Sequence, residues 1–306
     1  MIALEGGGNV SFSSDTKAEL CRVAIQKHCC ALAEAYGILL YCNMFTADEI
    51  RIVTSSPEFA ERLPKLFKRA FNASFDSIPS ADIKGKQTLS ITNKEHIRQI
   101  FAAYGYEAKG ILAHHINLGA LEENCCKASF LRGAFLAGGS ITDPSKSYHL
   151  ELVTDHYNVS RETFSILLEL GFSPKDASRG GNYIIYFKQS ETIEDFFTLM
   201  GAPVSAMDIM SAKVEKDMRN AVNRRVNCDS ANADKIVLAA EEQLEAIRRI
   251  ERTTGLDDLP DKLREAALLR IANPEASLTD LAALSIPPVS KSCISHRLRK
   301  LTEYLG

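Results

Sequence analysis

The segment Leu131-Arg-Gly-Ala-Phe-Leu-Ala-Gly-Gly-Ser-Ile141 has an altered copy earlier in the chain. When Cys29-Cys30 is placed over Cys125-Cys126, a shift of 96 residues, Ala35-Tyr-Gly-Ile-Leu-Leu-Tyr-Cys-Asn-Met-Phe45 lies over this stretch. Both copies have glycine at the third position, and their apolar positions coincide. An internal repeat constrains the architecture more strongly than local patterns do. The chain is therefore predicted to contain a duplicated unit.

Two later segments continue the repeat. Ile50–Thr54 lies over Leu150–Thr154 at a shift of 100, and Thr88–Ile97 lies over Ile184–Ile193 at the original shift of 96. A small insertion and a compensating deletion account for the change of the shift from 96 to 100 and back to 96. In each copy, apolar periodicity predicts an αββαββα unit. The clearest predicted elements are strands at Ile50–Thr54 and His149–Thr154, and helices at Glu58–Phe71, Asn158–Leu170, Asn93–Tyr104 and Glu191–Met200.

Small residues predict that the two motif helices pack closely against each other. Gly133 and Ala137 are four residues apart, as are Ala134 and Gly138. This spacing lets two helix backbones approach. The first copy has Tyr41 where the second has Ala137, so the packing is not expected to be symmetric.

The motif resembles the LAGLIDADG motif of homing endonucleases, whose fold is also a duplicated αββαββα unit. In those enzymes, an acidic residue at the eighth motif position binds the catalytic metal that phosphodiester hydrolysis needs. The corresponding residues here are Gly138 and, by the repeat register, Cys42. Neither is acidic, and Asp48 and Asp143 are expected to be turn residues. The sequence thus predicts a degenerate nuclease scaffold with no catalytic residue, metal or cofactor, which is not an enzyme.

Composition excludes the disordered and collagen-like classes of protein. The 306 residues suit two domains, and 45% hydrophobic with 25% charged residues is typical of globular proteins. No transmembrane helix or signal peptide is expected. The net charge of -3 does not exclude a local basic patch on the surface.

The eight cysteines include no C-x-x-C pair, so they predict neither a disulfide framework nor a zinc site. They are interpreted as buried free thiols that pack. A thiol switch at Cys29-Cys30 or Cys125-Cys126 is an alternative. A metal site at His114-His115 is disfavoured, since adjacent strand residues face opposite ways.

The C-terminal third predicts helices only. One covers Pro203–Arg219, and Asn220–Asn232 is rich in asparagine and is predicted to be a linker. Arg224 and Arg225 in it either contact phosphate or are solvated charges. Helices resume over Lys235–Arg252, with a stop at Gly255, and over Pro260–Ile271. In the second of these helices, the residues expected to face inward are Leu263, Ala267, Leu268 and Ile271.

A helix-turn-helix pattern follows. Ser277 and Asp280 form a capping box before the short helix Leu278–Leu284, and Ser290 caps a final helix over Lys291–Tyr304. The outer face of the final helix is basic and polar, as in a recognition helix that enters the major groove. The alternative is a helical hairpin with a solvated basic face.

The combination of a degenerate LAGLIDADG-like repeat with a C-terminal helix-turn-helix resembles the sporulation transcription regulator WhiA family. The resemblance covers about Ser11 to Leu305 and rests on the motifs Ser13-Ser-Asp-Thr-Lys-Ala-Glu-Leu20, Cys125-Cys126 with Phe130-Leu-Arg-Gly-Ala-Phe-Leu-Ala-Gly-Gly-Ser140, Asn223-Arg-Arg-Val-Asn-Cys-Asp-Ser-Ala-Asn232, and Pro287-Pro-Val-Ser-Lys-Ser292 with His296-Arg-Leu-Arg-Lys300. It implies an α+β repeat domain, an all-α DNA-binding domain and lost nuclease activity. The expected domains are a flexible tail (1–12), two repeats (13–107 and 108–203), a linker helix and Asn/Arg-rich linker (204–233) and the helix-turn-helix domain (234–306).

The resemblance also implies a function. It predicts a regulator of sporulation, or of cell division and chromosome segregation, in the cytoplasm of Gram-positive bacteria and associated with the nucleoid. The partners would be double-stranded DNA and another transcription regulator or RNA polymerase, with no membrane. The DNA contacts are assigned to Ser290, Lys291, Ser292, Ser295, His296, Arg297, Arg299 and Lys300. Alternatives are a LAGLIDADG endonuclease, or a scaffold that binds another transcription factor through the repeat domain.

Overall fold

The computed structural model describes residues 11–79, 85–106 and 113–304. Most of the predicted flexible tail lies outside these residues. The chain divides into two compact units, Met1–Lys216 and Asp217–Gly306. Within the described residues, no helix combines the length and apolar character needed to cross a membrane.

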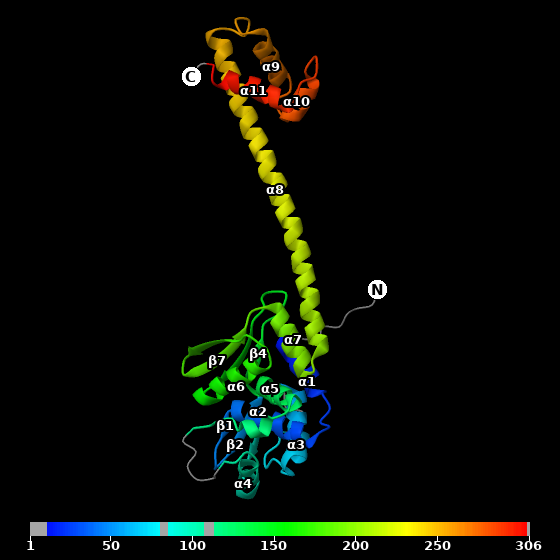
Figure 1. Ribbon diagram of the computed structural model, residues 1–306, viewed down its shortest axis with the longest axis vertical. Coiled ribbons are helices and arrows are strands. Elements are labelled where there is room, and N and C mark those ends of the chain that lie inside the picture. Colours follow the sequence, from blue (N-terminus) through cyan, green and yellow to red (C-terminus); the bar gives the residue numbers. More distant parts are fainter. Residues whose placement is uncertain (1–10, 80–84, 107–112, 305–306) are drawn as a thin grey trace. The chain divides into compact units, whose positions relative to one another are not determined.

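The first unit contains both copies of the repeat (Figure 1). Helix α1 (Phe12–Cys21) precedes them. The elements of the first copy are α2 (His28–Tyr41), β1 (Met44–Phe45), β2 (Ile50–Thr54), α3 (Pro57–Phe71), β3 (Gln87–Ile91) and α4 (Lys94–Ala103). After the 3₁₀ helix η1 (Leu118–Leu121), the elements of the second copy are α5 (Asn124–Gly138), β4 (Gly139–Ile141), β5 (Leu150–Thr154), α6 (Tyr157–Glu169), β6 (Lys175–Arg179), β7 (Asn182–Phe187) and α7 (Ser190–Met200).

Strand pairing confirms the register of the repeat. In the first copy Ile52 pairs with Leu89, and in the second Leu152 pairs with Ile185, so the shifts of 100 and 96 superimpose the same pair. The second copy has the full antiparallel sheet β4-β5-β7-β6, whereas the first has three strands, β1-β2-β3. Among the described residues of the first copy, the predicted fourth strand is reduced to one bridge between Ser77 and Ser90. Pro79 follows closely and has no N–H to extend the pairing.

The two motif helices, α2 and α5, pack side by side as predicted (Figure 1). A Cβ atom on Gly133 would lie 2.0 Å from the Glu34 carbonyl oxygen, and one on Gly37 would lie 2.1 Å from the Phe130 carbonyl oxygen. Only glycine allows so close a backbone contact. The asymmetry is confirmed at Tyr41, which is buried and donates a hydrogen bond to Thr163 Oγ1 at 3.0 Å.

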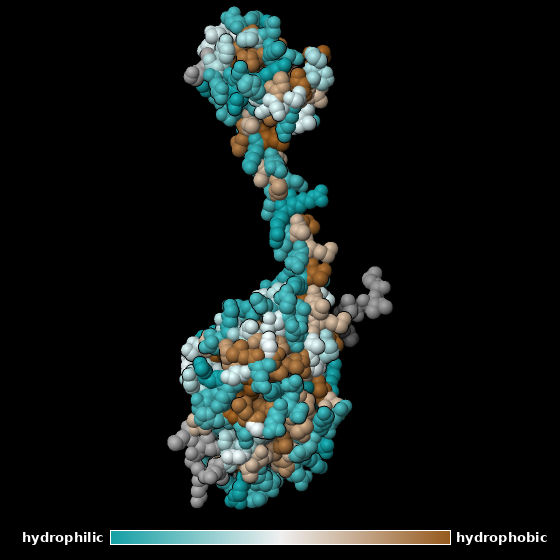
Figure 2. Space-filling model, in the orientation of Figure 1, coloured by the Kyte–Doolittle hydropathy of each residue, from teal (hydrophilic) through white to brown (hydrophobic). Residues whose placement is uncertain are grey.

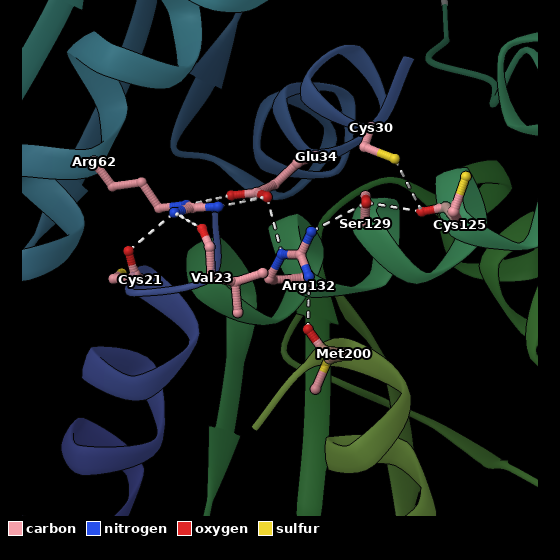
Figure 3. A network of polar contacts seen from close by, with 9 residues as sticks. All are labelled: Cys21, Val23, Cys30, Glu34, Arg62, Cys125, Ser129, Arg132 and Met200. Carbon is pink, nitrogen blue, oxygen red and sulfur yellow. Dashed lines mark hydrogen bonds and ion pairs between the residues drawn. The ribbon is translucent and has the colours of Figure 1, made fainter. Parts of the chain in front are cut away.

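A buried charge network joins α2, α3 and α5 beside this contact (Figure 3). Glu34 is 1% exposed and accepts two hydrogen bonds from Arg62, at 2.6 and 2.9 Å, and one from Arg132 Nε at 2.9 Å. The arginines also donate to backbone carbonyls, Arg62 to Cys21 and Val23 and Arg132 to Met200. The sequence analysis did not find this network, because its members lie in three separate helices.

Helix α8 (Pro203–Thr253) begins in the first unit and ends in the second. The linker predicted at Asn220–Asn232 is wrong, since the helix runs unbroken through it. The segment contains no glycine or proline, and asparagine disfavours a helix by less than about 1 kcal/mol per residue. Extending a formed helix needs no new nucleus. The predicted stop is confirmed, because Gly255 has φ +82° and its N–H donates to the Ile250 carbonyl oxygen.

The middle of α8 is exposed, and Figure 2 shows apolar residues alternating with hydrophilic ones along it. Its exposed apolar side chains include Val204, Met207, Met210, Val214, Met218, Val222 and Val226.

Candidate nucleic-acid interface

The second unit has a core of its own, built from the end of α8 and three further helices. These are α9 (Asp261–Ala272), α10 (Leu278–Leu284) and α11 (Lys291–Thr302). The core includes Ile247 and Ile250 from α8, Ala267 from α9, Leu281 from α10 and Leu298 from α11. The core orients α10 and α11 as successive helices joined by a short turn.

Both helix starts are capped as the sequence predicts. Ser277 accepts from the Asp280 N–H at 3.2 Å while Asp280 accepts from the Ser277 N–H at 3.1 Å, which completes the capping box. Ser290 accepts from the Cys293 N–H at 3.2 Å and starts α11. Ile294, Leu298 and Leu301 of α11 are buried. The remaining face of α11 is therefore free to meet a partner.

Arg270 of α9 supports the turn before α10. It is 2% exposed, and it donates to Gln243 Oε1 at 3.0 Å and to the Ala276 carbonyl oxygen at 2.7 Å. Its burial puts Leu268 and Ile271 at the surface, although the sequence predicted that both face inward. The apolar stripe was misassigned because a buried arginine occupies a core position of this helix.

The structure brings most of the predicted DNA contacts onto one exposed face. Six of the eight residues assigned at α11 are exposed: Ser290, Lys291, Ser292, His296, Arg299 and Lys300. Ser295 is half-buried. The residues of α11 include no acid; the carboxylate of Glu303, the C-cap, lies 3.7 Å from Arg299. The face therefore carries net positive charge beside small hydroxyl groups.

Arg297 differs from its neighbours. Its side chain is 14% exposed and donates to Glu265 Oε2 of α9 at 3.1 Å. It joins α11 to α9 rather than pointing away from the core. By contrast, the Arg299 side chain is 66% exposed and contacts His296 within its own helix.

Arg224 and Arg225 are not part of this cluster. Both are exposed on α8. Arg225 precedes the core residue Ile247 by 22 positions, which is about 33 Å along a helix at about 1.5 Å per residue. Any DNA contact they make is separate from that of α11.

The degenerate motif positions lie at the ends of the motif helices. Cys42 follows the last residue of α2, and burial raises the pKa of its thiol to about 12, with a smaller contribution from Asp155. Gly138 ends α5 and offers no side-chain ligand. Asp48 pairs with Lys94 at 2.5 Å, and Asp143 accepts from the Ser145 N–H in a turn. A half-buried thiol and a glycine do not make a Mg²⁺ site, since Mg²⁺ prefers oxygen ligands.

The two sheets differ in charge at their centres. Arg51 of β2 and Glu151 of β5 occupy equivalent repeat positions with opposite charges. Arg51 also lies 3.9 Å from Glu49. Neither of these two positions therefore adds net positive charge to its sheet.

The histidines of the disfavoured metal site face different partners. His114 stacks on Phe45, and burial lowers the pKa of its imidazole to about 4. His115 Nδ1 instead lies 2.9 Å from Glu162 Oε1. The two rings do not converge on a common ion.

Comparisons with known proteins agree with this architecture. A model of the WhiA LAGLIDADG-like domain matches residues 127–219, and a model of the WhiA C-terminal HTH domain matches residues 222–305. Proteins named "Probable cell division protein WhiA" from Ruminiclostridium cellulolyticum and Staphylococcus haemolyticus are 38% and 37% identical to the chain, with 96% of each chain covered. The crystal structure of full-length DUF199/WhiA from Thermatoga maritima has a TM-score of 0.60 at 24% identity and covers 96% of this chain and 97% of that one.

Proposed function

The chain belongs to the WhiA family, and from this premise we propose that it reads double-stranded DNA with α11 and regulates transcription without cutting DNA. It is a DNA-binding regulator of the WhiA type with a helix-turn-helix domain and a LAGLIDADG-like domain. We further propose which of its residues contact DNA and which cellular process it regulates.

The observation that carries the proposal is the exposed face of α11. Lys291 and Ser292 begin the helix, where a recognition helix reaches base edges. Arg299 and Lys300 lie at its other end, where cations meet phosphate. In this arrangement Ser290, Ser292, Ser295 and His296 contribute hydrogen bonds to bases or the backbone.

Binding draws its free energy from counterion release and its sequence preference from base contacts. Each neutralised phosphate releases a condensed cation, so affinity falls with salt. A good bidentate base contact adds discrimination of about 1–3 kcal/mol. We assign Arg224 and Arg225 to phosphate contacts outside the base-reading helix, and Arg297 to holding α11 on α9.

The LAGLIDADG-like domain then has a task other than cleavage. Cys42 and Gly138 support loss of nuclease activity, because neither offers an oxygen ligand. We propose that this domain binds another transcription regulator or RNA polymerase. The names of the relatives support a role in cell division; a role in sporulation or chromosome segregation, and association with the nucleoid in the cytoplasm, rest on the family resemblance.

Replacing Lys291 or Lys300 by alanine tests the proposal. Each change is expected to weaken DNA binding about tenfold and to lower the slope of log affinity against log salt by about 1. Gel-shift titrations of the full chain on fragmented genomic DNA of a Gram-positive bacterium, at two salt concentrations and with Mg²⁺, measure both quantities and any cleavage.

The matched control is Lys262→Ala, since Lys262 is exposed on α9. It is expected to leave affinity and slope unchanged. Equal effects of all three changes would mean that α11 contributes to DNA binding only through non-specific positive charge. Cut DNA would show that the nuclease function persists.

Exchanging Arg297 or Arg299 for methionine separates support from recognition. Arg297→Met is expected to lower the opening free energy of α9 and α11 amides by about 1.5 kcal/mol, because it leaves Glu265 without its charged donor. Arg299→Met is expected to weaken DNA binding with little change in stability. Hydrogen exchange of the full chain, combined with gel shifts, distinguishes the two roles; a stable Arg297→Met variant with lost binding would make Arg297 a direct contact.

A further inference from the structure

Four cysteines from the two copies meet at the start of the motif helices. Cys29 and Cys30 are the second and third residues of α2, and Cys125 and Cys126 hold the same positions in α5. Their four Sγ atoms all lie within 4.8 Å of one another. The spacing along the chain concealed this cluster, since each pair belongs to a different copy.

The interpretation of these residues as buried packing thiols fits Cys126, which belongs to the hydrophobic core, but not the exposed Cys29. Cys126 is buried, Cys30 and Cys125 are half-buried, and Cys29 is exposed. A core needs apolar atoms enclosed on all sides, whereas this cluster runs from the interior to the surface. A hollow lined by Lys27, Cys30 and Cys125 adjoins it and gives access from solvent.

We propose that Cys29, Cys30, Cys125 and Cys126 form a four-thiolate site for one soft divalent metal ion, foremost Zn²⁺, which joins α2 to α5. Four cysteine ligands in a tetrahedron are a common structural zinc site. A zinc–sulfur distance of about 2.3 Å places the sulfurs about 3.8 Å apart. The observed Sγ–Sγ separations, at most 4.8 Å, exceed that value by no more than about 1 Å.

The number of metal ions follows from the compactness of the cluster. An iron–sulfur cluster distributes its cysteine ligands over two or more iron ions, so the sulfurs must stand further apart. Hard ions such as Mg²⁺ and Ca²⁺ prefer oxygen ligands. A single soft ion fits both the ligand type and the separation of the sulfurs.

The surroundings suit the negative charge of a four-thiolate site. Both cysteine pairs lie in the first turn of a helix, where the dipole favours anions. Ser129 links the site to the charge network: it donates to the Cys125 carbonyl oxygen at 2.8 Å and accepts from Arg132 at 3.0 Å (Figure 3). Because that network holds two arginines and one glutamate, it carries net positive charge.

Metal binding would crosslink the two copies of the repeat. Four thiols lose their protons to solvent as the ion binds, with no change of oxidation state, so affinity rises with pH. The crosslink lies at the opposite helix ends from Cys42 and Gly138. It would therefore hold α2 and α5 together at the helix ends that are distant from the degenerate motif positions.

Cobalt substitution of the full chain tests the site directly. Chain purified under reducing conditions and freed of metal is titrated with Co²⁺, and then with Zn²⁺ in competition. We expect one ion per chain, visible bands of tetrahedral cobalt and a sulfur-to-cobalt charge-transfer band, all abolished by equimolar Zn²⁺. Metal should also protect four of the eight thiols from alkylation.

Cys29→Ser and the matched control Cys228→Ser complete the experiment. Cys29 is exposed, so its replacement leaves the fold intact, which circular dichroism verifies. We expect Cys29→Ser to weaken Zn²⁺ binding at least about 100-fold, since even loss of a partner to a ligand weakens binding about 10- to 100-fold. Cys228→Ser, in exposed α8, should bind as the unaltered chain does. No cobalt bands, equal binding by both variants, or a disulfide between α2 and α5 that persists in chain purified under reducing conditions would each overturn the proposal.

Discussion

Replacing Glu34 by glutamine is expected to destabilise the LAGLIDADG-like domain by about 3–5 kcal/mol, because it leaves two buried guanidinium groups without their counterion. Glu34 is 1% exposed and accepts three hydrogen bonds from Arg62 and Arg132. The glutamine side chain has the same shape, but its NH₂ group would face donors. A loss of this size is a large part of the 5–15 kcal/mol that typically holds a domain folded.

Hydrogen exchange measures this effect in the full chain. The slowest amides of α2 and α5 report global opening of the unit that contains them. Glu61→Gln is the matched control, since Glu61 is exposed on α3, and it should change the opening free energy by less than about 0.5 kcal/mol. A Glu34→Gln variant as stable as this control would mean that water, not the arginines, satisfies the carboxylate.

Replacing Gly133 by alanine is expected to destabilise the same domain by about 3 kcal/mol. The new Cβ atom would lie 2.0 Å from the Glu34 carbonyl oxygen and 3.0 Å from the Ile38 nitrogen. These are backbone atoms, so α2 and α5 must move apart. The overlap outweighs the gain of about 1 kcal/mol that alanine usually brings to a helix interior.

The control is Gly119→Ala, where the nearest atom is the Asn117 side-chain oxygen, 3.2 Å away. That oxygen already accepts a hydrogen bond from the Gly119 N–H at 3.1 Å, and a shift of a few tenths of an ångström relieves the contact. The change should therefore stay within about 1 kcal/mol. Thermal denaturation followed by circular dichroism, together with exchange of the α2 and α5 amides, compares the two variants. If Gly133→Ala were as stable as Gly119→Ala, the helices would not pack as closely as the structure shows.

Much of the fold could be predicted from local sequence patterns. The repeat placed β2 and β5 in equivalent positions, and the paired residues Ile52–Leu89 and Leu152–Ile185 confirm it. Capping chemistry placed the starts of α10 and α11, because a cap is made by residues three positions apart. The asparagine-rich middle of α8 misled the same approach, since low helix propensity alone does not end a helix.

The exposed face of α11 was predictable for a similar reason. Once Ile294, Leu298 and Leu301 are buried, helix geometry sends the remaining side chains of α11 outward. Arg297 is the exception, and its partner Glu265 lies 32 positions earlier. No pattern within α11 distinguishes it from Arg299.

Four features can be read from the sequence: the duplication, the paired motif helices, the absence of acidic residues at Cys42 and Gly138, and the helix-turn-helix. All of these follow from identity, spacing or periodicity along the chain. Three others emerge only in the folded protein: Glu34 neutralises two arginines, Arg270 is a core residue, and four cysteines converge. Those features depend on side chains from different helices, and contacts between distant segments leave no regular spacing in the sequence.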